Sequence, residues 1–421
     1  MDTIPITMIL GEIGVFLVIP ILVVILFNLW MHYRNALFLN SIEWVLLEIV
    51  PPKEVHKSPE AMELVLNSLY GGGYGNWYER YWKGELAQFY SLEIVSIEGK
   101  IHYYVRFAKK FRKVFEAQLY SQYPQAQVIE VPIDYVTKVP KLTRKDSPIG
   151  MWAYNVELAK DEVYPIKSYI DFGMDRAVGS LEEEQKIDPM SPMLEIMGSI
   201  GIGEQIWFQI NMRQVNKRFV VKKDDKEEPG QAWQKKADQV INELRKKINP
   251  PDKEGKVSLT PSTKGQLALI EAIERHKNKN AFECGIRVLY VAKKEHLKGD
   301  SIGAYTAMLR QFASDDMNSF KLSGLTKPSP EPWKDMLGIN LFKMKRDALE
   351  DYKARKFFYG SFNFKKIKRY FEHPANLGGN PFILTTEELA TLFHLPGRVI
   401  ETPTFTRQDS TKSEPPANLP I

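Results

Sequence analysis

The first hydrophobic feature of the chain is an apolar run close to its N-terminus. Residues 13–30 read IGVFLVIPILVVILFNLW, which is 18 residues without a charge. At about 1.5 Å of rise per residue, a helix of this length is roughly 27 Å long, close to the ~30 Å hydrocarbon core of a bilayer. We therefore predict a transmembrane helix over residues 13–31, preceded by a short extracytoplasmic N-terminus at residues 1–12.

Two alternatives to a membrane anchor are a cleaved signal peptide and a buried core helix. The flank before the run carries Asp2 and Glu12 but neither Lys nor Arg, and no small-residue cleavage site follows, which argues against a signal peptide. A core helix of this length would show a polar face. Trp30 and Tyr33 at the end of the run are expected, with Arg34, to anchor it at the membrane–water interface.

Basic residues near the run indicate its orientation. Arg34, Lys53 and Lys57 follow the run, and no basic residue precedes it. Because positive flanks stay in the cytoplasm, we expect a single-pass protein of the cell membrane with its N-terminus outside and its body cytoplasmic. The lone cysteine, Cys284, agrees with this compartment, since it cannot form an intramolecular disulfide.

Beyond the run, the hydrophobic period alternates between that of a strand and that of a helix. Strand-like stretches cover residues 41–50, 86–96, 100–107 and 126–131. Amphipathic helical stretches cover residues 58–70 and 109–123. Ser58 and Pro59 are start signals for the first helix, and Glu98-Gly99 predicts a turn. This βαββαβ order predicts an α+β protein whose residues 41–136 form a ferredoxin-like domain.

A basic stretch with prolines, residues 137–148, is interpreted as a linker to a second α/β domain at residues 150–326. Strand-like stretches there are 163–172, 204–213 and 281–292, and helical stretches are 191–199 and 302–312. Two charged helical stretches, 231–248 and 263–277, lie in residues 222–280, which we interpret as a helical insertion. The order resembles a weak second copy of the first domain. Residues 327–421 hold a basic and aromatic segment, a short helix at 385–393 and a Pro-rich tail.

Catalytic motifs do not emerge from the sequence. The phosphate-loop pattern GxxxxGK[ST] and the GxSxG pattern are absent. Glycines at 71–73 and at 198–203 follow helical stretches, whereas a dinucleotide fingerprint needs a strand followed by a helix. The histidines are scattered, and one cysteine cannot make a zinc set. We therefore predict a protein that is not an enzyme and uses no cofactor. An enzyme of unrecognised class is kept as a hypothesis that ranks below the two functions given at the end of this section.

The distribution of charge points to one candidate binding segment, residues 341–371. The chain has 57 basic and 52 acidic side chains, too small an excess to identify a nucleic-acid-binding protein. Residues 341–371, however, combine ten basic residues with nine aromatic ones, which suits phosphate and base contacts or anionic lipid. The competing interpretation, which we favour, is an amphipathic face whose aromatic residues enter the core. The candidate contact residues are Lys343, Lys345, Arg346, Arg355, Lys356, Lys365, Lys366, Lys368 and Arg369.

Several stretches, taken together and in order, resemble a bacterial family: the non-ATPase N-terminal region of proteins related to conjugative type IV secretion ATPases. The matching stretches include LLEIVPPKEVHKSPEAMELVLNSLYG (46–71), FYSLEIVSIEGKIHYYVRF (89–107), QLYSQYPQAQVIEV (118–131), YPIKSYIDF (164–172), GEQIWFQINMR (203–213), GIRVLYVAKKE (285–295), LTTEELATLFHLPG (384–397) and EPPANLP (414–420). In such relatives, a stretch like EPPANLP leads into an ATPase domain with its phosphate loop. This sequence ends at Ile421, so the resemblance implies an ATPase-free member or one that works with an ATPase in trans.

These observations lead to one expectation and one alternative. We expect a membrane-anchored, non-enzymatic platform subunit of a type IV secretion or conjugation-like machine. Its partners would be a P-loop ATPase in trans, other secretion subunits and, by analogy with symmetric platforms, further copies of itself. The alternative is a membrane-tethered nucleic-acid-binding protein that delivers DNA to a channel.

Overall fold

The computed structural model describes the chain in stretches separated by gaps. They are residues 6–52, 55, 57–71, 75–144, 147–175, 188–215, 232–248, 263–297, 299, 302–327, 332–358 and 381–397. The chain divides into two compact units. The first comprises residues 1–43, 73–88 and 359–379, and the second comprises residues 44–72, 89–358 and 380–421.

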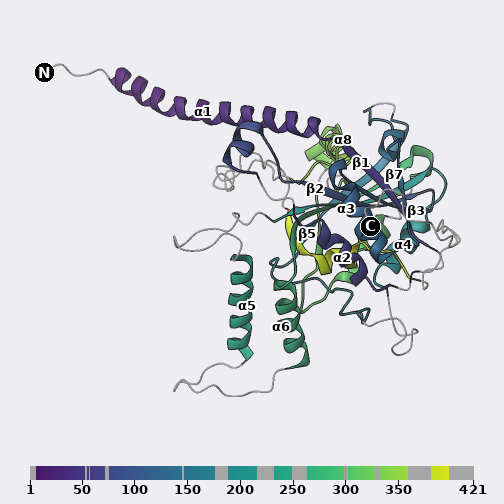
Figure 1. Cartoon of the computed structure of the whole chain (residues 1–421). Helices are drawn as coiled ribbons and strands as arrows, with labels where there is room; N and C mark the ends of the chain where they lie inside the picture. Colours follow the sequence, from purple (N-terminus) through teal and green to yellow (C-terminus); the bar gives the residue numbers. More distant parts are fainter. Residues whose placement is uncertain are drawn as a thin grey trace, which may run out of the picture. The chain divides into compact units, whose positions relative to one another are not determined.

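The first unit contains one long N-terminal helix, α1, which spans Ile6–Ser41 (Figure 1). Its part from Leu22 to Ser41 is long and apolar enough to cross a membrane. Large apolar side chains on it are exposed, among them Leu26 at 64% and Leu29 at 60%, whereas a helix in a soluble core would bury them. The predicted N-terminal apolar helix is therefore confirmed, and its length and composition are compatible with a membrane anchor or a signal sequence.

The second unit is built on one antiparallel β-sheet. Among the described residues its strands are β1 (Trp44–Val50), β2 (Phe89–Ile97), β3 (Lys100–Ala108), β4 (Gln127–Glu130), β5 (Ile149–Leu158), β6 (Glu204–Gln214), β7 (Ala281–Lys293), β8 (Phe320–Ser323) and β9 (Phe382–Thr385). They lie in the order β4-β1-β3-β2-β6-β7-β5-β8, and β9 pairs with one end of β7. Because β2 pairs with β6 along its length, the two segments predicted as separate α/β domains share one continuous sheet.

Residues 44–130 follow the predicted βαββαβ order. Helix α2 (Glu60–Ser68) follows β1, and α3 (Arg112–Gln122) follows β3 after a 3₁₀ turn at Lys109–Phe111. The predicted turn at Glu98-Gly99 joins β2 to β3, and both residues have positive φ, 52° and 84°, as a type I′ hairpin turn requires. Alternation, helix signals and turn residues all agree in this part of the chain, which is why its elements were predictable.

The other half of the sheet departs from the prediction in its strands, and neither β5 nor β8 was predicted. Helix α4 (Ser191–Gly198) and strands β6 and β7 lie where expected. The strand predicted at residues 163–172 is wrong, because these residues form turns, and β5 opens this half instead. Pro165 cannot donate to a strand ladder, and the side-chain amide and main-chain N–H of Asn318 bond the carbonyls of Tyr164 and Pro165, both at 2.9 Å.

Helices and loops cover both faces of the sheet. Helices α2, α3, α4, α7 (Ile302–Ala307) and α10 (Thr386–Leu392) enclose the larger core on one face. Helix α8 (Ile339–Lys353) and residues 135–142 enclose a smaller core on the other. The segment interpreted as a linker therefore contributes buried side chains, such as Val139. Since both faces are covered, adjacent residues of one strand, such as Trp207 and Phe208, are both buried.

The predicted helical insertion at residues 222–280 supplies two helices between β6 and β7. They are α5 (Ala232–Ile248) and α6 (Lys264–Lys277), which lie side by side in Figure 1. Their facing apolar residues form a small core of their own that includes Ile241, Ile273 and, from the turns, Val163. Thr263 and Gln266 form a capping box at the start of α6. Residues 216–231 and 249–262 lie outside the described residues.

In the C-terminal part, the short helix predicted at residues 385–393 is confirmed as α10. Helix α8 and strand β9 were not predicted. The α8 sequence drew attention as a basic segment rather than as a helix, and a four-residue strand is too short for a periodic signal. The Pro-rich tail lies outside the described residues.

Candidate functional site

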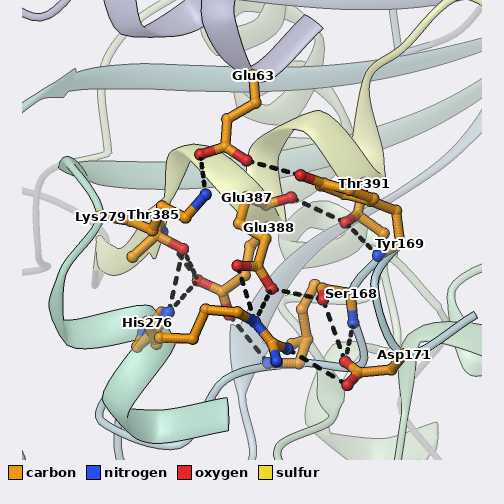
Figure 2. A network of polar contacts seen from close by, with 12 residues as sticks. Glu63, Ser168, Tyr169, Asp171, His276, Lys279, Thr385, Glu387, Glu388 and Thr391 are labelled. Atoms are coloured by element: carbon orange, nitrogen blue, oxygen red, sulfur yellow. Dashed lines mark hydrogen bonds and ion pairs between the residues drawn. The ribbon is translucent and has the colours of Figure 1, made fainter. Parts of the chain in front are cut away.

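Polar side chains gather where α10 meets the rest of the second unit, and we name this group the α10 cluster (Figure 2). Its side chains come from α2, from the turns at residues 163–172, from α6 and the residues just after it, and from the β9–α10 segment. The members are Glu63, Ser168, Tyr169, Asp171, Arg275, His276, Lys279, Thr385, Thr386, Glu387, Glu388 and Thr391. Segments more than 200 residues apart in the sequence are thereby joined.

Helix α10 begins with a capping box that also builds the cluster. The main-chain N–H of Thr385 donates to Oε2 of Glu388 at 2.8 Å, and the Thr385 side chain accepts from the main chain of Glu388. The other carboxyl oxygen of Glu388 accepts from the main-chain N–H of Ile166 at 2.9 Å. The T-x-x-E order in TTEEL is the sequence signal for this cap, but nothing in the sequence reveals the bond to Ile166.

His276 approaches the same carboxyl group from α6. Its Nδ1 lies 3.3 Å from Oε2 of Glu388 and 3.0 Å from the hydroxyl of Thr385, and its Nε2 lies 3.4 Å from the Glu162 carbonyl. Burial lowers the pKa of His276 to about 4 and raises the pKa of Glu388 to about 7. His276 is therefore neutral at physiological pH, and its 3.3 Å approach to Glu388 is not an ion pair.

Glu387 and Glu63 bind the remaining cations and hydroxyl groups. Glu387 accepts from the Ser168 hydroxyl at 2.6 Å and from Nε of Arg275 at 3.1 Å. Burial raises the pKa of Glu387, although Ser168 and Arg275 oppose that shift. Glu63 accepts from the Lys279 ammonium at 2.7 Å and from the Tyr169 hydroxyl at 2.9 Å, so it connects α2 to the segment that follows α6 and to the turns.

The α10 cluster is closed to solvent. Glu63, Glu387 and Glu388 are at most 4% exposed, and each carboxyl group is engaged by donors of the same unit. A general acid or base must reach a substrate, and these buried carboxyl groups do not. The α10 cluster therefore fits a structural role, in which it holds α10 against the rest of the unit, better than a catalytic one. Among the residues that the structure describes, no group of His, Cys, Asp and Glu is arranged to hold a metal ion.

His276 and Glu388 should give the stability of the chain an opposed pH dependence. The folded-state pKa of His276 is below its usual value, so the contribution of His276 to the free energy of unfolding rises between about pH 4 and 6.5. The folded-state pKa of Glu388 is raised to about 7, so the contribution of Glu388 falls between about pH 4.5 and 7. Relative to the wild-type protein, His276→Gln should therefore lose roughly 1–3 kcal/mol of stability as pH rises from 5 to 7, and Glu388→Gln should gain stability as pH rises from 4.5 to 7. Thermal unfolding of the full chain in detergent measures both. Identical pH profiles for the two variants would contradict the assignment.

A second buried network lies on the opposite face of the sheet and is centred on Arg355. Its guanidinium makes a bidentate pair with Glu93, with Nε to Oε1 at 2.7 Å and Nη2 to Oε2 at 3.0 Å, and it also binds Asp134. Tyr135 donates to Glu93 at 2.8 Å and so accepts from the hydroxyl of Tyr352, also at 2.8 Å. The end of α8 is thereby fixed to the centre of the sheet.

The electrostatics of this network follow from its burial. Burial alone would raise the pKa of Glu93, but the charge of Arg355 and the hydrogen bonds from Arg355, Ser91 and Tyr135 hold that pKa below its usual value. Glu93 is 0% and Arg355 2% exposed. Arg355 also has a positive φ of 47°, an uncommon conformation for a non-glycine residue that the surrounding contacts must hold in place.

Comparison with known families identifies most of the chain. The family described as Domain of unknown function (DUF8128) matches residues 33–336. The chain belongs to this family. The matched part of the DUF8128 chain holds strands β1 to β8, while α8, β9 and α10, which complete the two buried networks, follow it. No curated protein matches the chain.

The structure disperses the basic residues singled out in this DUF8128 sequence. Arg355 is committed to the interior, and Phe357 and Phe358, which follow it, are buried as well. On α8, Lys343 is exposed, Lys345 lies over the Trp152 ring at 4.8 Å, and Arg346 pairs with Asp347 at 2.8 Å. Lys356 is exposed and pairs with Asp351. Four candidates lie outside the described residues: Lys365, Lys366, Lys368 and Arg369.

The three residues expected to anchor the chain at a membrane interface lie on the last part of α1. Trp30 is 40% and Tyr33 59% exposed. The Arg34 guanidinium lies 5.6 Å from the centre of the Trp30 ring, within range of a cation–π contact. The two aromatic residues are therefore presented on the surface of the helix.

Proposed function

We propose that this chain is a membrane-anchored, non-enzymatic platform subunit of a type IV secretion or conjugation-like machine. Its body docks a separate P-loop ATPase or neighbouring subunits. The observation that carries the docking role is an exposed apolar element at the start of α8. Its large side chains are Trp333 at 71%, Met336 at 84%, Leu337 at 72%, Ile339 at 46% and Met344 at 42% exposure.

This α8 docking element, residues 333–344, is held in a defined shape. The Asp335 carboxylate accepts from the main-chain N–H groups of Asn340 at 3.1 Å and Leu341 at 2.8 Å, which caps the start of α8. Arg144 donates to the carbonyl of Leu337 at 3.0 Å. Exposed apolar residues gathered in one short segment are typical of protein-interaction sites, and a preformed element loses little conformational entropy on binding.

The body offers a rigid support for such docking, and we propose that it consists of two ferredoxin-like units. Strands β1 to β4 lie in the antiparallel order β4-β1-β3-β2, and β5 to β8 lie in the equivalent order β8-β5-β7-β6. The units join where β2 pairs with β6, and Glu93 and Gln209 face each other at the centre of that pairing. The α5–α6 pair is an insertion in the second unit.

The membrane location and the machine are further parts of the proposal. The exposed apolar helix α1 supports a single-pass anchor, and the basic residues that follow its apolar run favour a cytoplasmic body. The resemblance to the N-terminal region of conjugative secretion proteins suggests the machine and an ATPase in trans. Further copies of this chain in a symmetric ring or array are proposed by analogy.

Photo-crosslinking from native membranes tests the platform role. A crosslinking amino acid at Met336 is compared with one at Leu267, which is 54% exposed on α6 and lies outside the docking element. We expect Met336 to capture a chain with a phosphate loop or another membrane subunit, and Leu267 to capture neither. Equal capture at the two positions would contradict docking through α8. Capture of this chain alone would indicate self-assembly and would contradict docking of an ATPase or another membrane subunit.

The alternative function is delivery of DNA to a channel, suggested by the basic residues Lys343 and Arg346, which are three positions apart on α8. Nucleic-acid binding through phosphates must weaken as salt rises. Charge reversal at Lys365, Lys366, Lys368 and Arg369 tests it in the full chain. Loss of salt-dependent DNA binding with membrane assembly intact would favour this alternative. No binding of DNA by the unaltered protein at low salt would eliminate it.

A further inference from the structure

The first unit places a short aromatic and basic turn against α1, although the hydrogen-bonded residues of the two are 48 and 51 positions apart in the sequence. The turn comprises residues 77–83, WYERYWK, and is helical, with η1 at Glu79–Lys83. Asn76 and Glu79 cap its start, each accepting from the other's main-chain N–H, at 2.9 and 2.8 Å. Gly84, with φ of 75°, ends it. We name this element the 77–83 turn.

The turn docks on α1 through its main chain. Nε1 of Trp30 donates to the carbonyl of Tyr81 at 3.2 Å, and Nε of Arg34 donates to the carbonyl of Trp82 at 2.6 Å. The rings of Trp30 and Trp82 lie 5.7 Å apart, and those of Phe27 and Tyr81 lie 6.2 Å apart. Phe27, Trp30 and Arg34 are spaced three and four residues apart, so one face of α1 receives the turn.

Gly84 allows this close approach. A Cβ atom at position 84 would lie 2.5 Å from the carbonyl carbon of Arg34, closer than any real contact of that kind. The backbone therefore meets α1 where a side chain has no room. The contact joins residues far apart in the sequence, so local patterns do not predict it. Gly84, between Lys83 and Glu85, is the local sequence feature that allows it.

The docked turn keeps its aromatic side chains exposed. Trp77 is 68%, Tyr78 53% and Trp82 55% exposed, so packing against α1 does not account for them. Two cations lie among the rings: the Arg80 guanidinium over Tyr81 at 5.4 Å, and the Lys83 ammonium over Tyr78 at 5.9 Å. The one acidic residue of the turn, Glu79, is occupied in its cap, and Lys83 lies 3.8 Å from Glu85.

The turn contacts α1 at the end of its apolar run. Towards the N-terminus α1 exposes apolar side chains, with Leu22 at 49% and Val23 at 58%, and the apolar run ends at Trp30. The turn contacts α1 between Phe27 and Arg34, where that run gives way to polar residues. Tryptophan, tyrosine and cationic side chains favour this boundary in membranes, because their apolar parts leave water while their polar tips stay hydrated.

We propose that the 77–83 turn is a second membrane contact, which lies in the headgroup layer beside α1 and binds anionic phospholipid. This inference rests on the proposed membrane location of α1 and adds a lipid-binding surface to it. Exposed aromatic rings supply apolar area at the interface, and Arg80 and Lys83 supply charge opposite to that of the lipid. The turn fixes how far α1 enters the bilayer.

Depth measurements on the full chain in nanodiscs of phosphatidylcholine and phosphatidylglycerol test the inference. Cys284 is buried, so a nitroxide attached at Leu26→Cys, Tyr78→Cys or Leu64→Cys reports one position each. Leu64, on α2, serves as the control for an exposed residue of the body. We expect oxygen-accessible, lipid-buried behaviour at position 26, an intermediate headgroup depth at position 78, and water exposure at position 64.

The outcomes separate this inference from the membrane anchor itself. If position 78 is as exposed to water as position 64 while position 26 is buried in lipid, the anchor stands and the second contact is overturned. If position 26 is also in water, the anchor fails first.

A charge-neutralised pair tests the preference for anionic lipid. Arg80→Gln with Lys83→Gln should move the label at position 78 towards the water-exposed value, as should nanodiscs of phosphatidylcholine alone. The matched pair Lys235→Gln and Lys236→Gln on α5 should leave it unchanged. An unchanged depth at position 78 in the Arg80 and Lys83 variant would overturn the anionic-lipid assignment.

Discussion

Replacing Arg355 with methionine is expected to destabilise the folded body by about 3–5 kcal/mol, the usual cost of removing one partner of a buried ion pair. Methionine keeps most of the volume but leaves Glu93, which is 0% exposed, without its cation. Asp134 suffers less, because its side chain is 27% exposed and can be hydrated. Denaturant titration of the full chain in detergent measures the change, read as a lower midpoint.

Two further variants show whether the buried charge causes the loss. Lys356→Met removes the neighbouring cation, which is exposed and pairs with Asp351 at 3.3 Å, and should change stability by no more than about 0.5 kcal/mol. Adding Glu93→Gln to Arg355→Met should recover part of the loss, because the carboxylate is neutralised while an acceptor remains for Tyr135. Equal effects of Arg355→Met and Lys356→Met would show that the Arg355 network does not fasten α8.

Placing arginine at both Leu22 and Leu26 is expected to remove the protein from the membrane fraction. Both leucines are exposed on α1, at 49% and 64%, so arginine would cost little if this surface faced water. In a transmembrane helix each arginine near the centre costs about 2.5–3.5 kcal/mol on insertion scales, enough to prevent stable insertion. Carbonate extraction followed by quantification of the pellet measures the effect.

A matched arginine in the body provides the control for this change. Leu64→Arg alters an equally apolar side chain, 47% exposed on α2, and should leave the protein in the pellet. The intact mass of the purified wild-type chain separates an anchor from a signal sequence, because a cleaved signal would remove α1. Retention of the Leu22 and Leu26 variant in the pellet at the wild-type level is the result that would rule out α1 as the anchor.

The sequence predicted the fold best where local signals agree with each other. Apolar and polar residues alternate in β3, and Glu98-Gly99 supplies the residues that a tight hairpin needs. The prediction from the sequence was wrong at residues 163–172, where alternating apolar residues suggested a strand. The bonds from Asn318 that hold Tyr164 and Pro165 in turns come from more than 150 residues away, and periodicity does not contain that information.

The sites were harder to predict for the same reason. Arg355 was a candidate for phosphate contact because its neighbours in the sequence are basic and aromatic. Its partners, Glu93 and Asp134, lie more than 200 residues earlier, so its burial is a product of tertiary structure. Likewise, TTEEL contains the T-x-x-E signal of the α10 capping box, whereas nothing in the sequence indicates the contact of Glu388 with His276. The lipid-facing turn at residues 77–83 is recognisable only once Arg34 is seen beside Trp82.

The position of the body at the cytoplasmic side of the membrane is tested most directly by labelling single cysteines in native cells. Thr3→Cys reports the N-terminal side of α1 and Leu64→Cys the folded body, and the buried native Cys284 should stay silent. A membrane-impermeant maleimide should label Thr3→Cys in intact cells and Leu64→Cys only after permeabilisation. Labelling of Leu64→Cys in intact cells would contradict a membrane-anchored cytoplasmic platform.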